Sequence, residues 1–320
     1  MSGHLLGKSL CNKTIHSCHE HNHWDNACPP AAIISPGETV EFYQLDASSG
    51  QITRDTKPDD LLNLDFSLMN PIAGPIYVDG AEPGDALKVS LLDFGPSGWG
   101  WTGVVPNFGL LSDDFLEPAL NIWSYDVGFG APAMFGKDAR IPMKPFCGTI
   151  GVAPAAPGLH STIPPTATGG NMDIRDLALG VDLYLPVEVA GGLFSIGDPH
   201  AAQGDGEVCG SAIETPMAVA VKIDLVKQAG LRFPRFTTHG PVTNHLDAKG
   251  YEVTVGIGPD LMEASRNAVR GMIDLLSREH HLPAERAYML CSVAGDLRIS
   301  EIVDIPNWTV SFYMPRMIFN

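Results

Sequence analysis

The segment from Phe194 to Glu214 contains the densest set of side chains able to do chemistry, and reads FSIGDPHAAQGDGEVCGSAIE. An imidazole with several carboxylates suits a divalent metal of the zinc type, and the additional oxygen donors also suit calcium. A polar, glycine-rich turn with solvated charges is the alternative interpretation, and these residues alone leave both open. The metal-ligating or proton-transferring side chains are Asp198, His200, Gln203, Asp205 and Glu207.

A second acid-bearing loop precedes this segment, where two glycines lead into Asn171 and Asp173. Either residue can instead cap a helix, because Asn and Asp accept hydrogen bonds from exposed first-turn amides. An alternating pattern over 183–189 then predicts a strand that leads into 194–214, and Pro186 indicates an edge position. Both loops are therefore expected at the ends of rigid β-structure, where binding and catalytic groups tend to lie.

Five of the eleven histidines lie in the first thirty residues. His19, His21 and His23 would share one face of an extended strand, because side chains alternate with period two. That face could bind a metal, although the spacing matches no zinc-finger pattern. A surface strand rich in histidine is the simpler interpretation.

Aromatic residues and glycines alternate in GPSGWGWTGVVPNFGLL. Trp99, Trp101 and Phe108 on this flexible backbone would suit an apolar pocket with polar edges. The same aromatic side chains could instead cover a sheet. We predict that the two tryptophans bind substrate.

Alternating apolar and polar residues predict strands through most of the chain. Segments 36–46 and 83–93 share the form P-G-acid-x-apolar-x-apolar-x-x-Leu-Asp, and each reads as a turn followed by a strand. Two copies are too few for a solenoid and suggest a paired β-substructure. Residues 217–225 alternate with unusual regularity.

The last ninety residues change character. After a strand at 251–257, Asp260 and Glu263 stand at capping-box spacing before apolar residues at helical intervals. We predict an α+β fold that is β-rich, with mostly antiparallel sheets or a sandwich and a C-terminal α/β portion. Residues 1–228 would carry the site loops, and 229–320 would pack on them as part of one integrated unit.

The composition narrows the range of partners. The 320 residues include 20 basic and 37 acidic side chains, and the net charge of −17 disfavours nucleic acid and anionic membranes. Neither a signal peptide nor eighteen consecutive apolar residues is found, so a cytoplasmic protein is expected. Six cysteines without a CxxC pair indicate reduced thiols.

Long segments spread from about residue 20 to residue 305 resemble the acetamidase/formamidase family. Several such matches in order are a far more specific signal than one short motif. They are HNHWDNACPPAAIISPGETVEFYQLDASSGQI, GPIYVDGAEPGDALKVSLLD, GWGWTGVVPNFGLL, PFCGTIGVAPAAPG, STIPPTATGGNMD, FSIGDPHAAQGDGEVCGSAIE and AGDLRISEIVD.

The resemblance implies hydrolysis of a small aliphatic amide to carboxylate and ammonia, on a β-rich fold with a divalent metal, either zinc or calcium. The acid-rich motif of the family falls on Asp198, His200, Asp205 and Glu207, and its GGNMD motif on Asn171 and Asp173. Its early His-Asn pair falls on His21 and Asn22, followed here by His23 where an arginine is expected. The shorter chain favours the acetamidase type, and a homo-oligomer is the ordinary expectation.

From the resemblance and metal chemistry we assign Asp173, Asp198 and His200 as metal ligands. A zinc ion there would polarise the amide carbonyl and lower the pKa of water. Glu207 would take the proton from water and pass it to the leaving amine. His21 joins Glu207 as a catalytic residue, and Asn171 joins the tryptophans in binding substrate.

Two other classes of protein remain possible from the sequence. One is an amidase with Cys209 as nucleophile, although neighbouring acids raise the pKa of a thiol. The other is a β-protein that binds a metal or a carbohydrate without catalysis. The second predicts bound metal without turnover.

Overall fold

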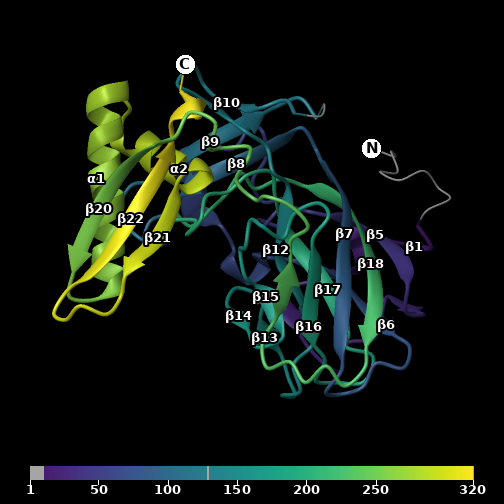
Figure 1. Ribbon diagram of the computed structural model, residues 1–320. Helices are drawn as coiled ribbons and strands as arrows, with labels where there is room; N and C mark the ends of the chain where they lie inside the picture. The colour runs from purple at the N-terminus through teal and green to yellow at the C-terminus, as the bar shows by residue number, and fades with distance from the viewer. Residues whose placement is uncertain (1–10, 128–129, 320) are drawn as a thin grey trace.

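The computed structural model describes residues 11–127 and 130–319 (Figure 1). Two large sheets, both mainly antiparallel, share an apolar core, and a C-terminal helix pair packs against a smaller sheet. The predicted β-rich α+β fold is confirmed. Within the described residues, no helix is both long enough and apolar enough to cross a membrane.

The six-stranded sheet has the order β1-β5-β18-β7-β16-β19. The two repeated segments form β5 and β7, which flank β18 and do not pair with each other. Strand β16 is not an edge strand, but its partner β19 reaches only residues 182–184 and leaves Pro186 outside that ladder. The proline is tolerated because it has no amide to donate there. The strands are β1 (Lys13–Ile15), β5 (Glu38–Gln44), β7 (Ala86–Pro96), β16 (Asp182–Pro186), β18 (Met217–Val226) and β19 (Arg235–Thr237).

The seven-stranded sheet has the order β14-β15-β12-β17-β6-β2, with β4 also paired to β6. Its apolar side chains meet those of the first sheet, as in the edge-on contact of the Phe42 and Phe194 rings at 5.9 Å. This burial of alternate residues from both sheets is the main source of their stability. The strands are β2 (Glu20–His21), β4 (Ala32–Ile34), β6 (Ile72–Val78), β12 (Phe146–Val152), β14 (Pro165–Thr166), β15 (Gly169–Asn171) and β17 (Phe194–His200).

The C-terminal sheet consists of β20 (Tyr251–Gly258), β22 (Trp308–Pro315) and β21 (Asp296–Glu301), in that order. Helices α1 (Leu261–His280) and α2 (Ala284–Ala294) pack on it (Figure 1). The carboxylate of Asp260 accepts a hydrogen bond from the Glu263 amide at 2.9 Å, as its capping position predicts. This second apolar core includes residues from both sides of position 228.

The remaining elements are short. The histidine segment is not one strand, because a 3-10 turn precedes two separate two-residue strands. The rings of His21 and His23 still lie edge-on with centroids 6.5 Å apart, whereas His19 belongs to the turn. The remaining strand pairs are β3 (His23–Trp24) with β13 (His160–Ser161), β8 (Trp99–Val104) with β9 (Ala119–Ser124), and β10 (Ala133–Phe135) with β11 (Ala139–Ile141); the 3-10 turns are Ser17–His19, Pro58–Asn63, Phe66–Leu68 and Arg316–Ile318.

Candidate functional site

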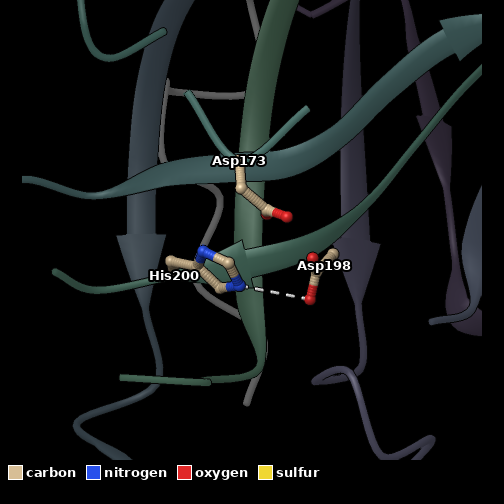
Figure 2. Close-up of side chains that lie close together, drawn as sticks. All are labelled: Asp173, Asp198 and His200. Carbon is tan, nitrogen blue, oxygen red and sulfur yellow. Dashed lines mark ion pairs between the residues drawn. The ribbon is translucent and has the colours of Figure 1, made fainter. Parts of the chain in front are cut away.

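Three potential metal ligands converge near the ends of two strands of the seven-stranded sheet. Asp198 and His200 belong to β17, and Asp173 lies two residues beyond β15. The imidazole Nε2 of His200 is 3.2 Å from the Asp198 carboxylate, and Figure 2 shows the Asp173 side chain coming from a separate segment toward this pair. One ligand atom from each residue lies within 4.8 Å of the others.

Glu207 and Glu214 extend this cluster, since they form a second group of ligand atoms around the same histidine. The Nε2 atom of His200 is 3.0 Å from Glu214 Oε2, because an isolated β-bridge joins their backbones. Glu214 is a site residue that the sequence did not reveal. Its place at the end of the acid-rich segment was the available signal.

Strand β12 brings the two ligand-bearing strands together, because it pairs with β15 on one side and β17 on the other. Gly148 on β12 faces the cluster: a Cβ there would lie 2.3 Å from Asp173 Oδ1 and 2.6 Å from Asp198 Oδ2. Any larger residue would occupy the space between the carboxylates.

The backbone at the site is strained. Asp173, Asp198 and Glu207 have positive φ angles of 49°, 53° and 41°. Such values are uncommon for residues other than glycine and persist only when the surrounding structure enforces them. Three strained residues in one cluster are typical of a functional site.

Gln203 fixes the protonation of the His200 ring. The Gln203 carbonyl Oε1 accepts a hydrogen bond from His200 Nδ1 at 2.9 Å, and its amide group donates to the Asp173 carbonyl oxygen at 2.8 Å. The other ring nitrogen, Nε2, faces the carboxylates of Asp198 and Glu214 at 3.2 and 3.0 Å, and in the neutral ring it would offer its lone pair to a metal. Within the described chain, this Nε2 atom, Asp173 Oδ1 and Glu214 Oε2 are buried without a hydrogen bond. This is the donor arrangement expected of a metal-binding histidine with a supporting partner.

The crowded acids perturb one another. Burial and then the Asp198 carboxylate raise the pKa of Asp173 to about 7, and burial raises that of Glu214 to about 7. Burial and then Asp173 raise the pKa of Glu207 well above its usual range. Burial lowers the pKa of His200, but Glu214 and Asp198 outweigh it and leave the pKa raised. A cation held among these groups would relieve their repulsion.

A cavity of about 120 Å³ opens onto the cluster. Its size suits a small molecule, since drug-sized sites occupy about 300–1,000 Å³. Its lining combines polar side chains with a larger set of apolar ones. The polar lining residues are Asn70, Asn171, Asp198, Glu207, Ser211 and Glu214, and the apolar ones are Ala47, Leu64, Phe66, Met69, Trp101, Val105, Phe108 and Ile163.

The predicted substrate-binding residues have different places. Trp101 and Asn171 line the cavity, and Trp101 Nε1 donates a 3.0 Å hydrogen bond to the buried Asp46 carboxylate. Trp99 lines another groove, with Tyr43 among its neighbours. His21, on β2, is not among the described residues lining the cavity.

Cys209 is buried and apart from the cavity lining. Its Sγ donates to the carbonyl oxygens of Gly103 and Ser211, each at 3.6 Å. Burial raises the pKa of this thiol to about 11. The thiol form therefore dominates at neutral pH, which is unfavourable for a nucleophile.

Comparisons with known proteins agree with the geometry. A family model described as the Acetamidase/Formamidase family matches residues 11–161 and 156–320. A formamidase of Methylophilus methylotrophus is 29% identical, over 93% of this chain and 89% of that protein. An acetamidase of Mycolicibacterium smegmatis is 28% identical, over 92% of this chain and 89% of that protein.

Solved structures show the same likeness. A γ-lactamase from Delftia acidovorans has a TM-score of 0.89 at 27% identity, over 96% of this chain and 93% of its own. An acetamidase from Bacillus halodurans has a TM-score of 0.67 at 31% identity, over 94% of this chain and 96% of its own. The expected family and enzyme class are confirmed: this chain belongs to the Acetamidase/Formamidase family and is a hydrolase that acts on amides.

Proposed function

We propose that the chain is a metal-dependent amidohydrolase that converts a small aliphatic amide and water to a carboxylate and ammonia. The observation that carries the proposal is the cluster of half-buried Asp173 with buried Asp198, His200 and Glu214 beside a small cavity that Asp198 and Glu214 line. Zinc is the metal we favour, because the donors are one imidazole and several carboxylates, and calcium is the alternative.

The proposed ligands are Asp173, Asp198 and His200, with Glu214 as a fourth. The convergence of His200 Nε2 on the carboxylates of Asp198 and Glu214, and the buried Asp173 Oδ1 without a hydrogen bond in the described chain, support this set. When bound, a divalent cation supplies Lewis acidity to the amide carbonyl and to water.

Glu207 is the proposed general base. Its side chain lines the cavity and shares a group of ligand atoms with His200 and Glu214, and burial and then the Asp173 carboxylate raise its pKa. A raised pKa suits a group that takes a proton from water and delivers it to the departing amine at neutral pH. His21 keeps its proposed catalytic role on the family resemblance alone.

Asn171 is the proposed contact for the substrate carbonyl. Its Oδ1 accepts a hydrogen bond from the Thr149 hydroxyl at 2.7 Å, which orients the amide so that its NH₂ group can donate into the cavity. Trp101, Phe108 and Met69 limit the acyl group. Formamide, acetamide and propionamide should therefore be hydrolysed, whereas bulky aryl amides should not.

A cyclic amide is the second candidate substrate. It is favoured by the similarity in shape to the γ-lactamase of Delftia acidovorans, with a TM-score of 0.89. Ammonia release from the linear amides and ring opening of a γ-lactam, measured with the same preparation, distinguish the two substrates.

The substitution Trp101→Ala should widen the range of acyl groups that the enzyme accepts. Unchanged relative rates across the series of linear amides would exclude Trp101 as a wall of the substrate cavity.

Metal removal tests the central proposal. A chelator should abolish ammonia release and added zinc should restore it, with calcium as the comparison ion. Full activity in protein shown by elemental analysis to be metal-free would contradict it. We also propose that the chain forms a homo-oligomer and lies in the cytoplasm. Measurement of the solution mass would test the oligomeric state.

A further inference from the structure

A single carboxylate from the C-terminal sheet contacts both segments that carry site residues. Asp296, at the start of β21, is fully buried. It accepts hydrogen bonds from two NH groups of the buried Arg175, the longer at 2.9 Å, and from the Asp205 amide at 3.3 Å. Arg298, a third partner residue, donates a fourth hydrogen bond at 3.2 Å, so the carboxylate has partners from three positions in the chain.

These partners are close in sequence to the proposed ligand and base. Arg175 follows Asp173 by two residues, and Asp205 precedes Glu207 by two residues. The Arg175 guanidinium also reaches the Asp205 carboxylate, at 3.3 Å. The two site segments are thus joined to each other and to Asp296.

Backbone hydrogen bonds also anchor the segment that carries Asp205 and Glu207 to the C-terminal portion of the chain. The Leu297 amide donates to the Asp205 carbonyl at 2.9 Å, and the Gly204 amide donates to the Ser292 carbonyl at 2.8 Å. A Cβ on Gly204 would lie only 1.9 Å from the Gly295 carbonyl oxygen. This segment therefore packs directly on the end of α2 and the start of β21.

The strained backbones explain why such anchoring is required. Asp173 and Glu207 both have positive φ, which is uncommon for residues other than glycine, although aspartate adopts it more readily than glutamate. A strained conformation persists only when contacts from elsewhere enforce it. Asp296 supplies such contacts within two residues of each strained position.

We propose that Asp296 is a positioning residue for this enzyme, which through Arg175 and the Asp205 amide holds Asp173 and Glu207 in the geometry of the site. The inference rests on the proposed metal-dependent function. It assigns to the C-terminal portion a direct part in forming a site whose ligands all come from earlier in the chain.

Zinc affinity of the Asp296→Asn variant is the first test, because it needs no turnover. Loss of a supporting group beyond the ligands typically weakens metal binding about 10–100-fold, and we expect that loss here. The zinc dissociation constant is measured by competition with a chelator. The kcat should fall while KM changes little, because the cavity wall is untouched.

Asp138→Asn is the matched control. The Asp138 carboxylate also forms an ion pair with an arginine of the C-terminal portion, because it lies 3.0 Å from the guanidinium of Arg286 on α2. It is not among the residues that form the ligand groups or line the cavity. Its zinc affinity and kcat should remain those of the wild type.

A double variant separates positioning from simple stabilisation. Removing one partner of a buried ion pair leaves an uncompensated charge, so Asp296→Asn could unfold the chain. Replacing both partners, as Arg175→Met with Asp296→Leu, often restores stability because apolar groups fill the space. It does not restore an acceptor for the Asp205 amide, so we expect a folded protein with weak zinc binding.

Wild-type zinc affinity in either folded variant would overturn the positioning role while leaving the proposed function intact. Failure of the wild-type protein itself to bind either zinc or calcium would overturn the proposed function and this inference with it.

Discussion

Glu207 lies two residues from Cys209 in the segment between β17 and β18, and the two side chains have different surroundings. The glutamate lines the cavity beside the carboxylate cluster, whereas the thiol is buried against Gly103 and Ser211. These surroundings suit the glutamate to proton transfer and the thiol to packing.

Glu207→Gln should lower kcat by about 10²–10⁴-fold, because the amide keeps the size of the side chain but cannot accept the proton. The variant should remain folded. Rates of ammonia release, normalised to measured metal content, separate loss of the base from loss of metal.

Cys209→Ala is the companion variant and should retain most activity, with a loss of about 1 kcal/mol in unfolding free energy, typical of a modest core substitution. The wild type should not transfer its acyl group to hydroxylamine through a covalent enzyme intermediate. An active Glu207→Gln beside an inactive, folded and metal-replete Cys209→Ala would assign the chemistry to the thiol.

At the scale of elements, β12 determines how closely the ligand-bearing strands approach. Gly148 is the position where it leaves room for Asp173 and Asp198. Gly148→Ala should displace both carboxylates and weaken zinc binding by about tenfold or more, comparable to the loss of a supporting group around a metal. Isothermal titration with zinc measures the effect.

Gly151→Ala is its control on the same strand. The added Cβ would lie 2.6 Å from the Gly170 amide nitrogen and 3.0 Å from the Trp24 ring, not against the carboxylates. This variant should lose stability with a smaller change in zinc affinity. Equal zinc affinity in Gly148→Ala and wild type would show that the carboxylates do not bind the metal together.

At the scale of the whole molecule, the site makes stability depend on pH. Glu214 has an ordinary pKa of 4.5 that rises to about 7 in the folded chain, chiefly because of burial. The folded chain therefore holds this proton to higher pH than the unfolded chain. The resulting stability is complete below pH 4.5 and is lost as pH rises through about 7.

The metal-free protein should consequently be less stable at pH 7.5 than at pH 5.5, and Glu214→Gln should reduce that difference by about 1–3 kcal/mol. Urea unfolding with chelator present measures it. Glu279→Gln, an exposed carboxylate on α1, removes the same charge from the net −17 and should leave the difference nearly unchanged. Equal changes in the two variants would assign the effect to overall charge.

Local patterns in the sequence predicted much of this molecule. The alternation over 217–225 became β18, Asp260 caps α1 as its spacing with Glu263 predicts, and several long segments identified the family. These features depend on neighbours in the chain, so the sequence by itself determined them. The dense ligand types between Asp198 and Glu207 likewise marked the segment that now contains the candidate site.

Tertiary structure alone decided which side chains meet. Trp99 and Trp101 are two residues apart on β8, but only Trp101, held by Asp46, lines the cavity with the carboxylates. Glu214 reaches His200 through a β-bridge, and Asp296 reaches the site segments from the far end of the chain. Such contacts depend on strand order and on packing between distant segments, and a local pattern of apolar and polar residues specifies neither.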